Sequence, residues 1–482
     1  MGNSSARRAR EPRNRTTSRG VAAAVLLAVV AGTALAAGPV AAAPPTAEGV
    51  DGMDGVWRTD GYGTVLAIRD GRLREYQTTG VSCLPGGAAR RTGHGGDGSV
   101  IYTGGDATVY RIRPEADGTG ANLHFDGSVG DRALRRLPAL PDRCAKATST
   151  GALRTFDVFW QTFEENYPFF AAKGIDWRAV RDRYRPKVHD GMPDAELFAL
   201  LREMVRPLYD AHVNIDAGET GDFAQSRPGT VAPGPGLDGR AQRFVERTDL
   251  GGKRLRSFAN GRIGYARLPD GIGYLRISGF GGYDGDSPTY DRNSAVLDQT
   301  LTQVIKPGLR GLVLDLRING GGSDALALRI AERLTDRPYF AYAKRARNHP
   351  GDPSRFTRPQ RWDVQPTPHR SRYTGPLAVL TGGETYSAGE TLTQALMQRP
   401  AKTTRIGRNT QGVFSDVMER ALPNGWHFGL PNEEYLTPSG TTFDGEGIPP
   451  GIRTGDFLRE IEAGTHDSAF ARAVAKLRRQ SR

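Results

Sequence analysis

Ser387 is the residue whose type and setting most directly suggest catalysis. It lies in the stretch GGETYSAGETLTQAL (residues 382–396), between a strand-like segment and one whose apolar residues have helical spacing. The turn TYSAG at 385–389 is close to the G-x-S-x-G elbow, in which a strained corner lifts a serine hydroxyl clear of the backbone. The alternative is that Ser387 only caps the following helix, with Glu390 completing a capping box. This stretch alone leaves both interpretations open.

A second turn with unusual chemistry is the glycine loop NGGG at 319–322, which follows the predicted strand 311–317. Three successive glycines let the backbone approach a ligand closely and aim an N–H group at it. The loop lacks the lysine and the spacing of G-x-x-x-x-G-K-[ST], so the sequence argues against a nucleotide site. We expect Asp315 and Arg317 to pair with each other and hold this loop.

A catalytic serine needs a base, and His212 is the best placed of the eight histidines. It follows the end of a predicted helix, is flanked by Asp210 and Asn214, and opens a segment of alternating apolar residues. His427 in NGWHFGL is the second candidate, although it reads most simply as a strand residue packed beside Trp426.

Composition and charge exclude several function classes. The chain has 482 residues, of which 38% are apolar and 24% charged, as expected for a soluble protein of several domains. Residues 1–19 contain six arginines and one glutamate, and so carry five of the twelve net positive charges. The rest of the chain has no basic stripe interleaved with aromatic residues, so we expect no nucleic-acid binding.

The N-terminus has the pattern of an export signal. A basic segment precedes the apolar residues 20–38, and small residues near Ala43 supply a cleavage site. No other segment approaches transmembrane length, so we expect an exported, soluble protein. In an exported chain the two cysteines, Cys83 and Cys144, favour a disulfide. Without CxxC or paired histidines, we expect no metal and no other cofactor.

The elements that must position these residues fall into successive regions. Short alternating strands with glycine turns fill residues 49–147. Helices are predicted at 176–184, 194–206 and 325–334, a loop at 220–239, and a basic surface insertion or β-ribbon at 344–372. We therefore divide the chain into a signal peptide 1–43, a β-rich module 49–147, a helical cap 152–216, a linker and strand region 217–262, an α/β core 263–455 and a C-terminal helix 456–482.

Five motifs together resemble the S41 family of serine peptidases, the tail-specific or C-terminal processing proteases. They are ENYPFFAAKGIDW, LYDAHVNI, GLVLDLRINGGG, VLTGGETYSAGE and DGEGIPP, in that family's order. The resemblance covers residues 152–475 and leaves the β-rich module outside it. It implies an α/β (α+β) multidomain protein whose core has the ββα-spiral shared with crotonase-like proteins. No PDZ-like segment is evident between His212 and the strands near 263.

Members of that family are of two catalytic types. One uses a Ser/Lys dyad with the lysine 25 residues after the serine, where this sequence has Gly412. The other, typified by the tricorn core protease, uses serine, histidine and an acidic residue. The resemblance to this second type implies that Ser387 is the nucleophile and His212 the base. Ala211 replaces a further serine that such proteins carry just before the histidine.

The acidic member of the triad has two candidates in FDGEGI. Asp444 matches the family's glutamate position for position, and Glu446 is its rival because a shorter aspartate reaches less far. The implied mechanism is acyl transfer with His212 as general base. The N–H of Ala388, with one from Gly320 or Gly321, would form the oxyanion hole.

The sequence therefore predicts an exported serine endopeptidase that acts on protein or peptide substrates. The alternatives are a binding protein with the same core, inactive or weakly active, for an apolar ligand or peptide, and a small-molecule esterase. The sequence does not indicate the oligomeric state.

Overall fold

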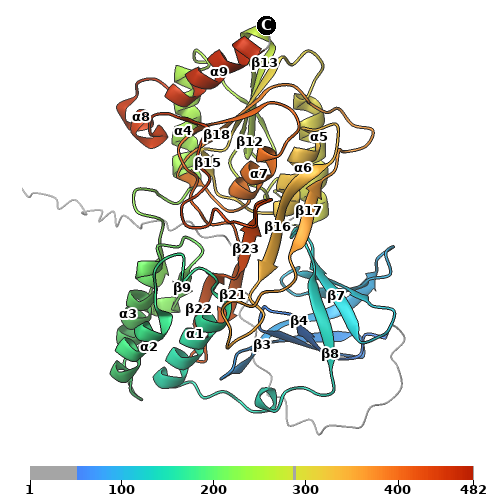
Figure 1. Cartoon of the computed structure of the whole chain (residues 1–482), viewed down its shortest axis with the longest axis vertical. Helices are drawn as coiled ribbons and strands as arrows, with labels where there is room; N and C mark the ends of the chain where they lie inside the picture. The colour runs from blue at the N-terminus through green and yellow to red at the C-terminus, as the bar shows by residue number, and fades with distance from the viewer. Residues whose placement is uncertain (1–51, 286–288, 481–482) are drawn as a thin grey trace, which may run out of the picture.

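The computed structural model describes residues 52–285 and 289–480 (Figure 1). The predicted signal peptide, residues 1–43, lies outside the described residues. None of the helices in the described ranges combines the length and apolar character that a membrane crossing requires. The chain forms a β-barrel, a helical unit and a large α/β unit, with the α/β unit above the other two in the view of Figure 1.

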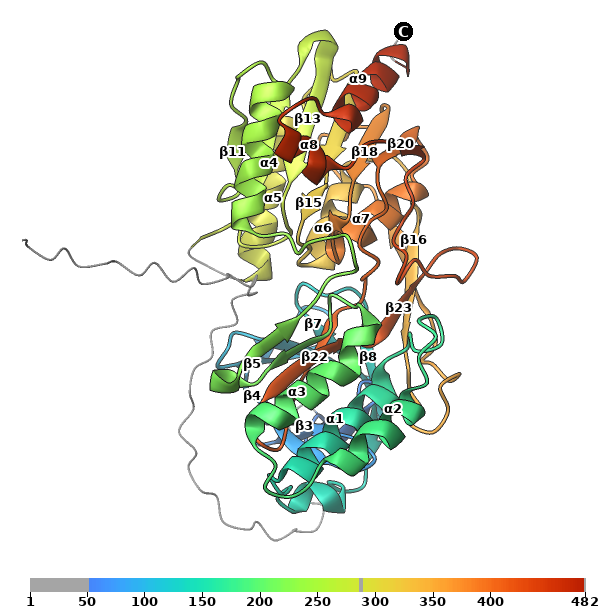
Figure 2. The same ribbon diagram turned by 90° about the vertical axis from the view of Figure 1, so that its left-hand side faces the viewer.

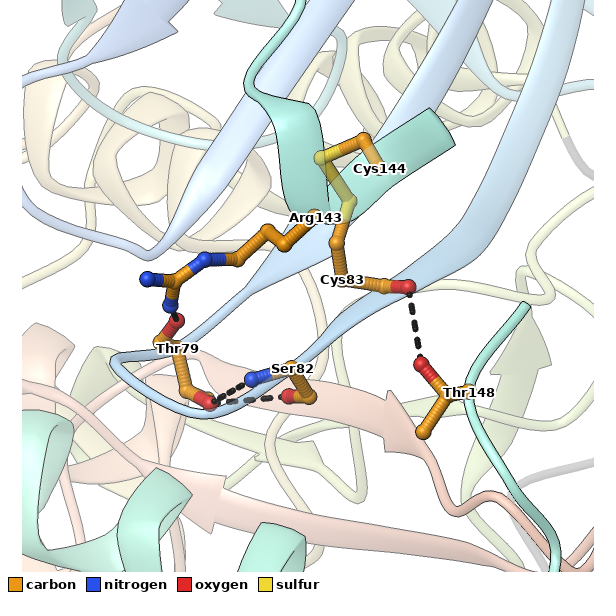
Figure 3. Close-up of a disulfide and its surroundings, with 6 residues drawn as sticks. All are labelled: Thr79, Ser82, Cys83, Arg143, Cys144 and Thr148. Atoms are coloured by element: carbon orange, nitrogen blue, oxygen red, sulfur yellow. Dashed lines mark hydrogen bonds between the residues drawn. A yellow bond between two sulfur atoms is a disulfide. The ribbon is translucent and has the colours of Figure 1, made fainter. Parts of the chain in front are cut away.

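The N-terminal module is a closed barrel of eight antiparallel strands, which confirms the prediction of an all-β module. The strands are β1 (Gly55–Thr59), β2 (Thr64–Arg69), β3 (Arg72–Thr78), β4 (Cys83–His94), β5 (Val100–Gly104), β6 (Val109–Pro114), β7 (Gly120–Phe125) and β8 (Arg132–Leu137). Each pairs with its neighbour in sequence, and β1 closes the barrel on β8. The interior is filled by side chains such as Trp57, Tyr102 and Ile112. A disulfide joins Cys83 at the start of β4 to Cys144 in the segment after β8 (Figure 3).

The helical unit consists of α1 (Ala152–Asn166), α2 (Trp177–Tyr184) and α3 (Asp194–Val205). The helices predicted at 176–184 and 194–206 are confirmed within a residue, and Asp176 caps α2 through its carboxylate. The unit packs on a four-stranded sheet in the order β10-β9-β22-β21. These strands are β9 (Asn214–Asp216), β10 (Asp222–Ala224), β21 (Val417–Ala421) and β22 (His427–Pro431). Phe159 of α1 contacts Phe428 of β22 with ring centroids 4.9 Å apart, so the C-terminal half of the chain completes this core (Figure 2).

The α/β unit is built on a seven-stranded sheet in the order β11-β12-β13-β14-β18-β20-β24. The strands are β11 (Arg256–Phe258), β12 (Ile263–Arg267), β13 (Ile272–Ile277), β14 (Gly311–Asp315), β18 (Leu377–Thr381), β20 (Thr403–Gly407) and β24 (Ile452–Arg453). From β13 to β24 the strands are parallel, and the apolar runs of β13, β14 and β18 are buried on both faces. Leu312 and Leu314 face α5 (Tyr290–Val304), α6 (Asp324–Glu332) and α7 (Ala388–Met397). Val313 faces α4 (Pro235–Thr248), α8 (Phe457–Ala463) and α9 (Ser468–Gln480).

The loop predicted at 220–239 is wrong in part, because β10 lies within it and α4 begins at Pro235. Proline is favoured at the first helical position, where its missing N–H has no partner to lose. The buried face of α4 consists of Leu237, Ala241, Phe244 and Val245, which recur at helical spacing. Two glycines in the first turn and a half of this helix concealed that pattern.

Short strands connect the α/β unit to its neighbours. The segment 344–372 is a β-ribbon in part: β16 (Tyr339–Ala346) pairs antiparallel with β17 (Gln360–Val364), and β23 (Glu433–Leu436) pairs on the other side of β16. β15 (Ile318–Asn319) and β19 (Glu384–Thr385) pair in parallel just beyond the ends of β14 and β18. This pair brings the glycine loop and the turn around Ser387 side by side.

Candidate active site

Ser387 occupies a strained corner between β19 and α7. Its backbone has φ 52° and ψ −122°, a conformation that costs a non-glycine residue about 1–3 kcal/mol. It stands at the N-cap position, yet its side chain makes no capping hydrogen bond to the helix. Its N–H donates to the carbonyl of Val413 over 3.0 Å. The bond that would define Ser387 as a helix cap is therefore missing, and the hydroxyl is not used to hold the helix.

Glu390 stabilises the loop that holds this corner in place. The side chain is fully buried, and its two oxygens accept N–H bonds from Gly412 over 2.7 Å and from Val413 over 2.8 Å. Burial raises the pKa of Glu390 to about 7, although these bonds and the Thr410 hydroxyl act in the opposite direction. Because Val413 in turn accepts the Ser387 N–H, Glu390 fixes the loop against which the serine is held.

The glycine loop packs closely against Ser387, with no room for a side chain at Gly321. Gly321 has φ 79°, and a Cβ at this position would lie 2.5 Å from Ser387 Cβ, 3.0 Å from its Oγ and 3.1 Å from the Ala388 nitrogen. The N–H of Gly320 donates to Ser278 O over 3.1 Å, and that of Gly321 to the Asn319 side chain over 2.9 Å. Within the described residues the Ala388 N–H has no acceptor. In this arrangement Ala388 offers a free donor beside the serine, whereas the two glycine N–H groups are already bonded.

Arg317 and Asp315 hold the base of this loop, as predicted. Arg317 is 1% exposed, and its guanidinium bonds both oxygens of Asp315 over 2.7 and 3.0 Å. A third bond of 2.7 Å reaches Asp467, the residue before α9. The loop therefore begins from a buried ion-pair network that ties β14 to the C-terminal helix.

His212 lies between the helical unit and β9. Its backbone N–H donates to Asp210 Oδ1 over 3.0 Å, and Asp210 is buried and accepts the Tyr167 hydroxyl over 2.8 Å. The imidazole Nδ1 is shielded from solvent and has no hydrogen-bond partner among the described residues. Burial lowers the pKa of His212, while the carboxylates of Asp210 and Asp416 act to raise it. The ring is therefore neutral at pH 7, the form that a general base requires.

The two candidate acids differ in their surroundings. Asp444 is half-buried and accepts bonds from the Phe414 N–H over 3.2 Å and from the Thr442 hydroxyl. Burial raises the pKa of Asp444, and the charges of Glu390 and Asp210 add to this effect. Glu446 is exposed.

Asp416 is a residue that the sequence did not single out. It follows the loop 412–415, and its carboxylate acts electrostatically on His212. Its Oδ2 accepts the Ser128 hydroxyl of the barrel over 3.1 Å and lies 3.8 Å from the buried Lys344 ammonium. No local motif marks it, because its partners come from distant parts of the chain.

One loop connects the two halves of the site. Val413 bonds to Ser387, and its neighbour Phe414 bonds to Asp444, which lies close enough to Asp210 for their charges to interact. Asp210 in turn bonds to His212. No hydrogen bond joins Ser387 directly to His212 within the described residues. Ser387 and Asp444 are thus held by neighbouring residues of one loop, and Asp444 is linked to the Asp210–His212 pair only through its charge.

Comparison with known proteins gives matches in the same regions. Residues 271–454 match the model of peptidase family S41, and residues 153–206 match that of the tricorn protease C1 domain. A chloroplastic C-terminal processing peptidase of Tetradesmus obliquus is 28% identical over 200 residues, 40% of this chain and 38% of the relative. A carboxy-terminal-processing protease of Bartonella bacilliformis is 29% identical over 188 residues, 39% of each protein. The match thus spans about two fifths of the length of either relative.

One solved structure shares most of the architecture. A peptidase described as putative, from Parabacteroides merdae, aligns over 68% of this chain and 97% of its own, with 26% identity and a TM-score of 0.55. Together these similarities support the expected fold class and a core like that of S41 peptidases.

Proposed function

Because residues 271–454 match the model of peptidase family S41, we propose that this protein is an exported serine endopeptidase that cleaves peptide bonds through an acyl-enzyme on Ser387. The observation that carries the proposal is the corner at Ser387. Its hydroxyl makes no capping bond, its backbone is strained, and it lies against Gly321, where the positive φ and the lack of space require glycine.

In the proposed first step, His212 removes the hydroxyl proton as the Ser387 oxygen attacks the substrate carbonyl. The lowered pKa of the imidazole keeps it unprotonated and ready to accept that proton. Ser387 and His212 must then come within hydrogen-bond reach when substrate binds, since catalytic bonds often tighten only in the complex. The protonated histidine next donates to the leaving amine, and water releases the acyl group by the reverse route.

The developing oxyanion is stabilised in this proposal by the Ala388 N–H at the start of α7. A free N–H at a helix N-terminus, together with the helix dipole, favours negative charge. A second donor from Gly320 or Gly321 requires that one of them release its present acceptor, Ser278 O or the Asn319 side chain.

Asp444 is the proposed acid, and its half-buried position beside Phe414 supports it over the exposed Glu446. The negative charges of Asp210 and Asp416 interact with His212 and would stabilise the imidazolium that forms during the reaction. The names of the two curated relatives suggest cleavage near the C-terminus of a protein substrate. We leave the cleavage position to experiment, because the match covers only part of each relative.

The test compares purified parent protein with Ser387→Ala on unfolded protein, peptide amides and p-nitrophenyl esters. The proposal predicts amide cleavage by the parent and a loss of about 10³-fold or more in the variant. Labelling of the parent, but not the variant, by a fluorophosphonate would confirm the acyl-enzyme site. Equal activity in the two proteins would overturn the proposal, and ester cleavage without amide cleavage would indicate an esterase instead.

A further inference from the structure

A cavity of about 900 Å³ lies where the barrel, the end of α1 and the loop between β16 and β17 meet. Barrel residues from the β1–β2 and β3–β4 turns form one wall, and Glu165 and Asn166 form another. The third wall comes from the basic insertion that the proposed reaction does not use. The cavity contains neither Ser387 nor His212, and its volume is within the range of ligand sites, about 300–1,000 Å³.

Arginine dominates the lining of this cavity, which we call the arginine cavity. The lining contains two carboxylates and five arginines, which are Arg58, Arg135, Arg143, Arg347 and Arg355. Within the described part of the chain, none of the five guanidinium groups lies within ion-pair distance of a carboxylate. An excess of unpaired cations in one concave site attracts an anionic ligand.

Two of these arginines lie directly opposite each other. Arg58 on β1 and Arg135 on β8 are paired in register across the strands that close the barrel, and both side chains are exposed. Like charges at such a position repel each other and destabilise the sheet. A bound anion between them would remove this repulsion.

Arg347 supplies a buried donor with no partner. It is 5% exposed, and its Nη1 donates to the carbonyls of Glu164 and Tyr167 over 2.7 and 3.2 Å. Its Nε is buried and has no hydrogen-bond partner in residues 52–285 and 289–480. Buried polar groups are nearly always bonded, so the guanidinium of Arg347 is incompletely satisfied by the two carbonyls that it contacts.

Arg143 is held in place by the disulfide. Figure 3 shows it next to Cys144, with its guanidinium donating to the Thr79 carbonyl over 2.5 Å. The Cys83–Cys144 bond therefore anchors the segment that carries Arg143 to the β3–β4 turn of the barrel. This cross-link maintains one wall of the cavity at a fixed distance from the next.

The two carboxylates in the lining are already occupied. Asp60 accepts the Asn348 amide over 3.2 Å. Glu165 accepts the Gly80 N–H over 2.6 Å and the Gln161 amide over 2.7 Å. Burial also raises the pKa of Glu165, which weakens its negative charge. Arg143 and Arg58 act electrostatically on Glu165, but a single half-occupied carboxylate cannot balance the five arginines of the cavity.

We propose that the arginine cavity binds an acidic stretch of polypeptide and so serves as a second substrate-binding site of the peptidase. Guanidinium groups bind carboxylates through paired hydrogen bonds, which suits glutamate and aspartate side chains. The cavity is connected to the catalytic residues: the Tyr167 carbonyl accepts from Arg347, and its hydroxyl donates to Asp210 beside His212. The inference that the ligand is substrate rests on the proposed peptidase function.

The test measures binding without cleavage. A fluorescein-labelled hexaglutamate peptide is titrated, by fluorescence anisotropy, into full-length Ser387→Ala protein and into the same protein carrying Arg58→Glu and Arg135→Glu. The expected result is saturable binding that weakens at least about tenfold on charge reversal and weakens further as salt screens the charges. The milder pair Arg58→Gln and Arg135→Gln should give an intermediate loss, with thermal unfolding monitored to confirm folding.

The matched control is Arg72→Glu with Arg74→Glu, two exposed arginines of β3 in the same barrel that do not line the cavity. This pair makes the same change in net charge and should alter binding by less than about twofold. Equal weakening in both pairs would overturn the proposal, because it would show attraction to the whole barrel. No binding of hexaglutamate, or competition by inorganic phosphate at equal concentration, would also overturn it. Because the measurement uses an inactive serine variant, it can succeed or fail independently of the peptidase activity.

Discussion

Substituting Gly321 with alanine perturbs the closest contact in the candidate site. The added Cβ would lie 2.5 Å from Ser387 Cβ, nearer than non-bonded carbon atoms can approach, and 3.1 Å from the Ala388 nitrogen. Gly321 also has φ 79°, a conformation that costs a non-glycine residue about 1–2 kcal/mol. Either the glycine loop or the Ser387 corner must therefore move.

The expected loss of stability follows from these two terms. Overpacking of a tight site typically costs about 1–3 kcal/mol, so the free energy of unfolding should fall by about 2–5 kcal/mol in all. The activity of the protein that remains folded should fall as well. Displacing Ser387 or covering the Ala388 N–H removes oxyanion stabilisation, which is worth about 10²–10³ in kcat.

The neighbouring glycine provides a matched control. A Cβ at Gly320 would meet only Pro233 Cγ, at 3.5 Å, which is ordinary van der Waals contact. Gly320 does not have a positive φ, and its N–H bond to Ser278 survives the substitution. Gly320→Ala should therefore change the free energy of unfolding by less than about 1 kcal/mol. Its effect on kcat/KM should stay within about tenfold.

The assays are urea denaturation for stability and kcat/KM on a peptide amide for activity, both at 25 °C. Fluorophosphonate labelling reports whether any remaining folded protein still presents an activated serine. Equal losses in the two alanine variants would refute the reasoning, because they would show that close approach at Gly321 is not what matters. A fully active Gly321→Ala protein would refute the placement of the oxyanion beside Ala388.

Three further outcomes follow from the structure. Burial lowers the pKa of His212 below the ordinary histidine value of about 6.5. The protein should therefore be fully active above about pH 6.5 and should lose activity only as the pH falls through the lowered pKa of the folded state. An acid limb of the kcat/KM profile centred above about pH 6.5 would contradict this. Asp444→Asn should reduce kcat by about 10²-fold or more, while Glu446→Gln on the exposed side chain should change it by less than about twofold, and the reverse order would assign the acid to Glu446. Arg317→Ala leaves the buried carboxylates of Asp315 and Asp467 without a cation, so the free energy of unfolding measured with urea should fall by about 3–5 kcal/mol. A fall of less than about 1 kcal/mol would show that water reaches this network.

The elements around the serine could be predicted because their signals are local. The strand, the small residues of the turn and the helix are each encoded within a few positions, and burial on both faces gives β14 and β18 continuous apolar runs. The resemblance to peptidase family S41 rested on the same short segments, and residues 271–454 match that family. The pairing of Asp315 with Arg317 could also be predicted, since the two residues are only two positions apart.

The electrostatic surroundings of His212 could not be predicted in the same way. Asp416 is more than 200 positions away in the chain, and its own partners come from the barrel and from β16. The helix α4 was missed for another reason: Gly236 and Gly239 have low helix propensity, and only packing of its apolar face on the sheet overrides them. Contacts formed by the folded chain decided both cases.

Gly412 is the position at which the absence of a catalytic lysine can be explained by the structure as well as read from the sequence. Dyad members of the family carry their lysine at this position, and a glycine here says only that the lysine is absent. In the fold, Gly412 has φ 89°, and a Cβ would lie 2.7 Å from the backbone of Gly445 and 2.8 Å from that of Gly447. Its N–H is meanwhile bound by Glu390. A lysine at 412 would collide with backbone that cannot move aside cheaply. The base that we propose for Ser387 therefore remains His212, whose imidazole is neutral and whose buried Nδ1 has no hydrogen-bond partner among the described residues.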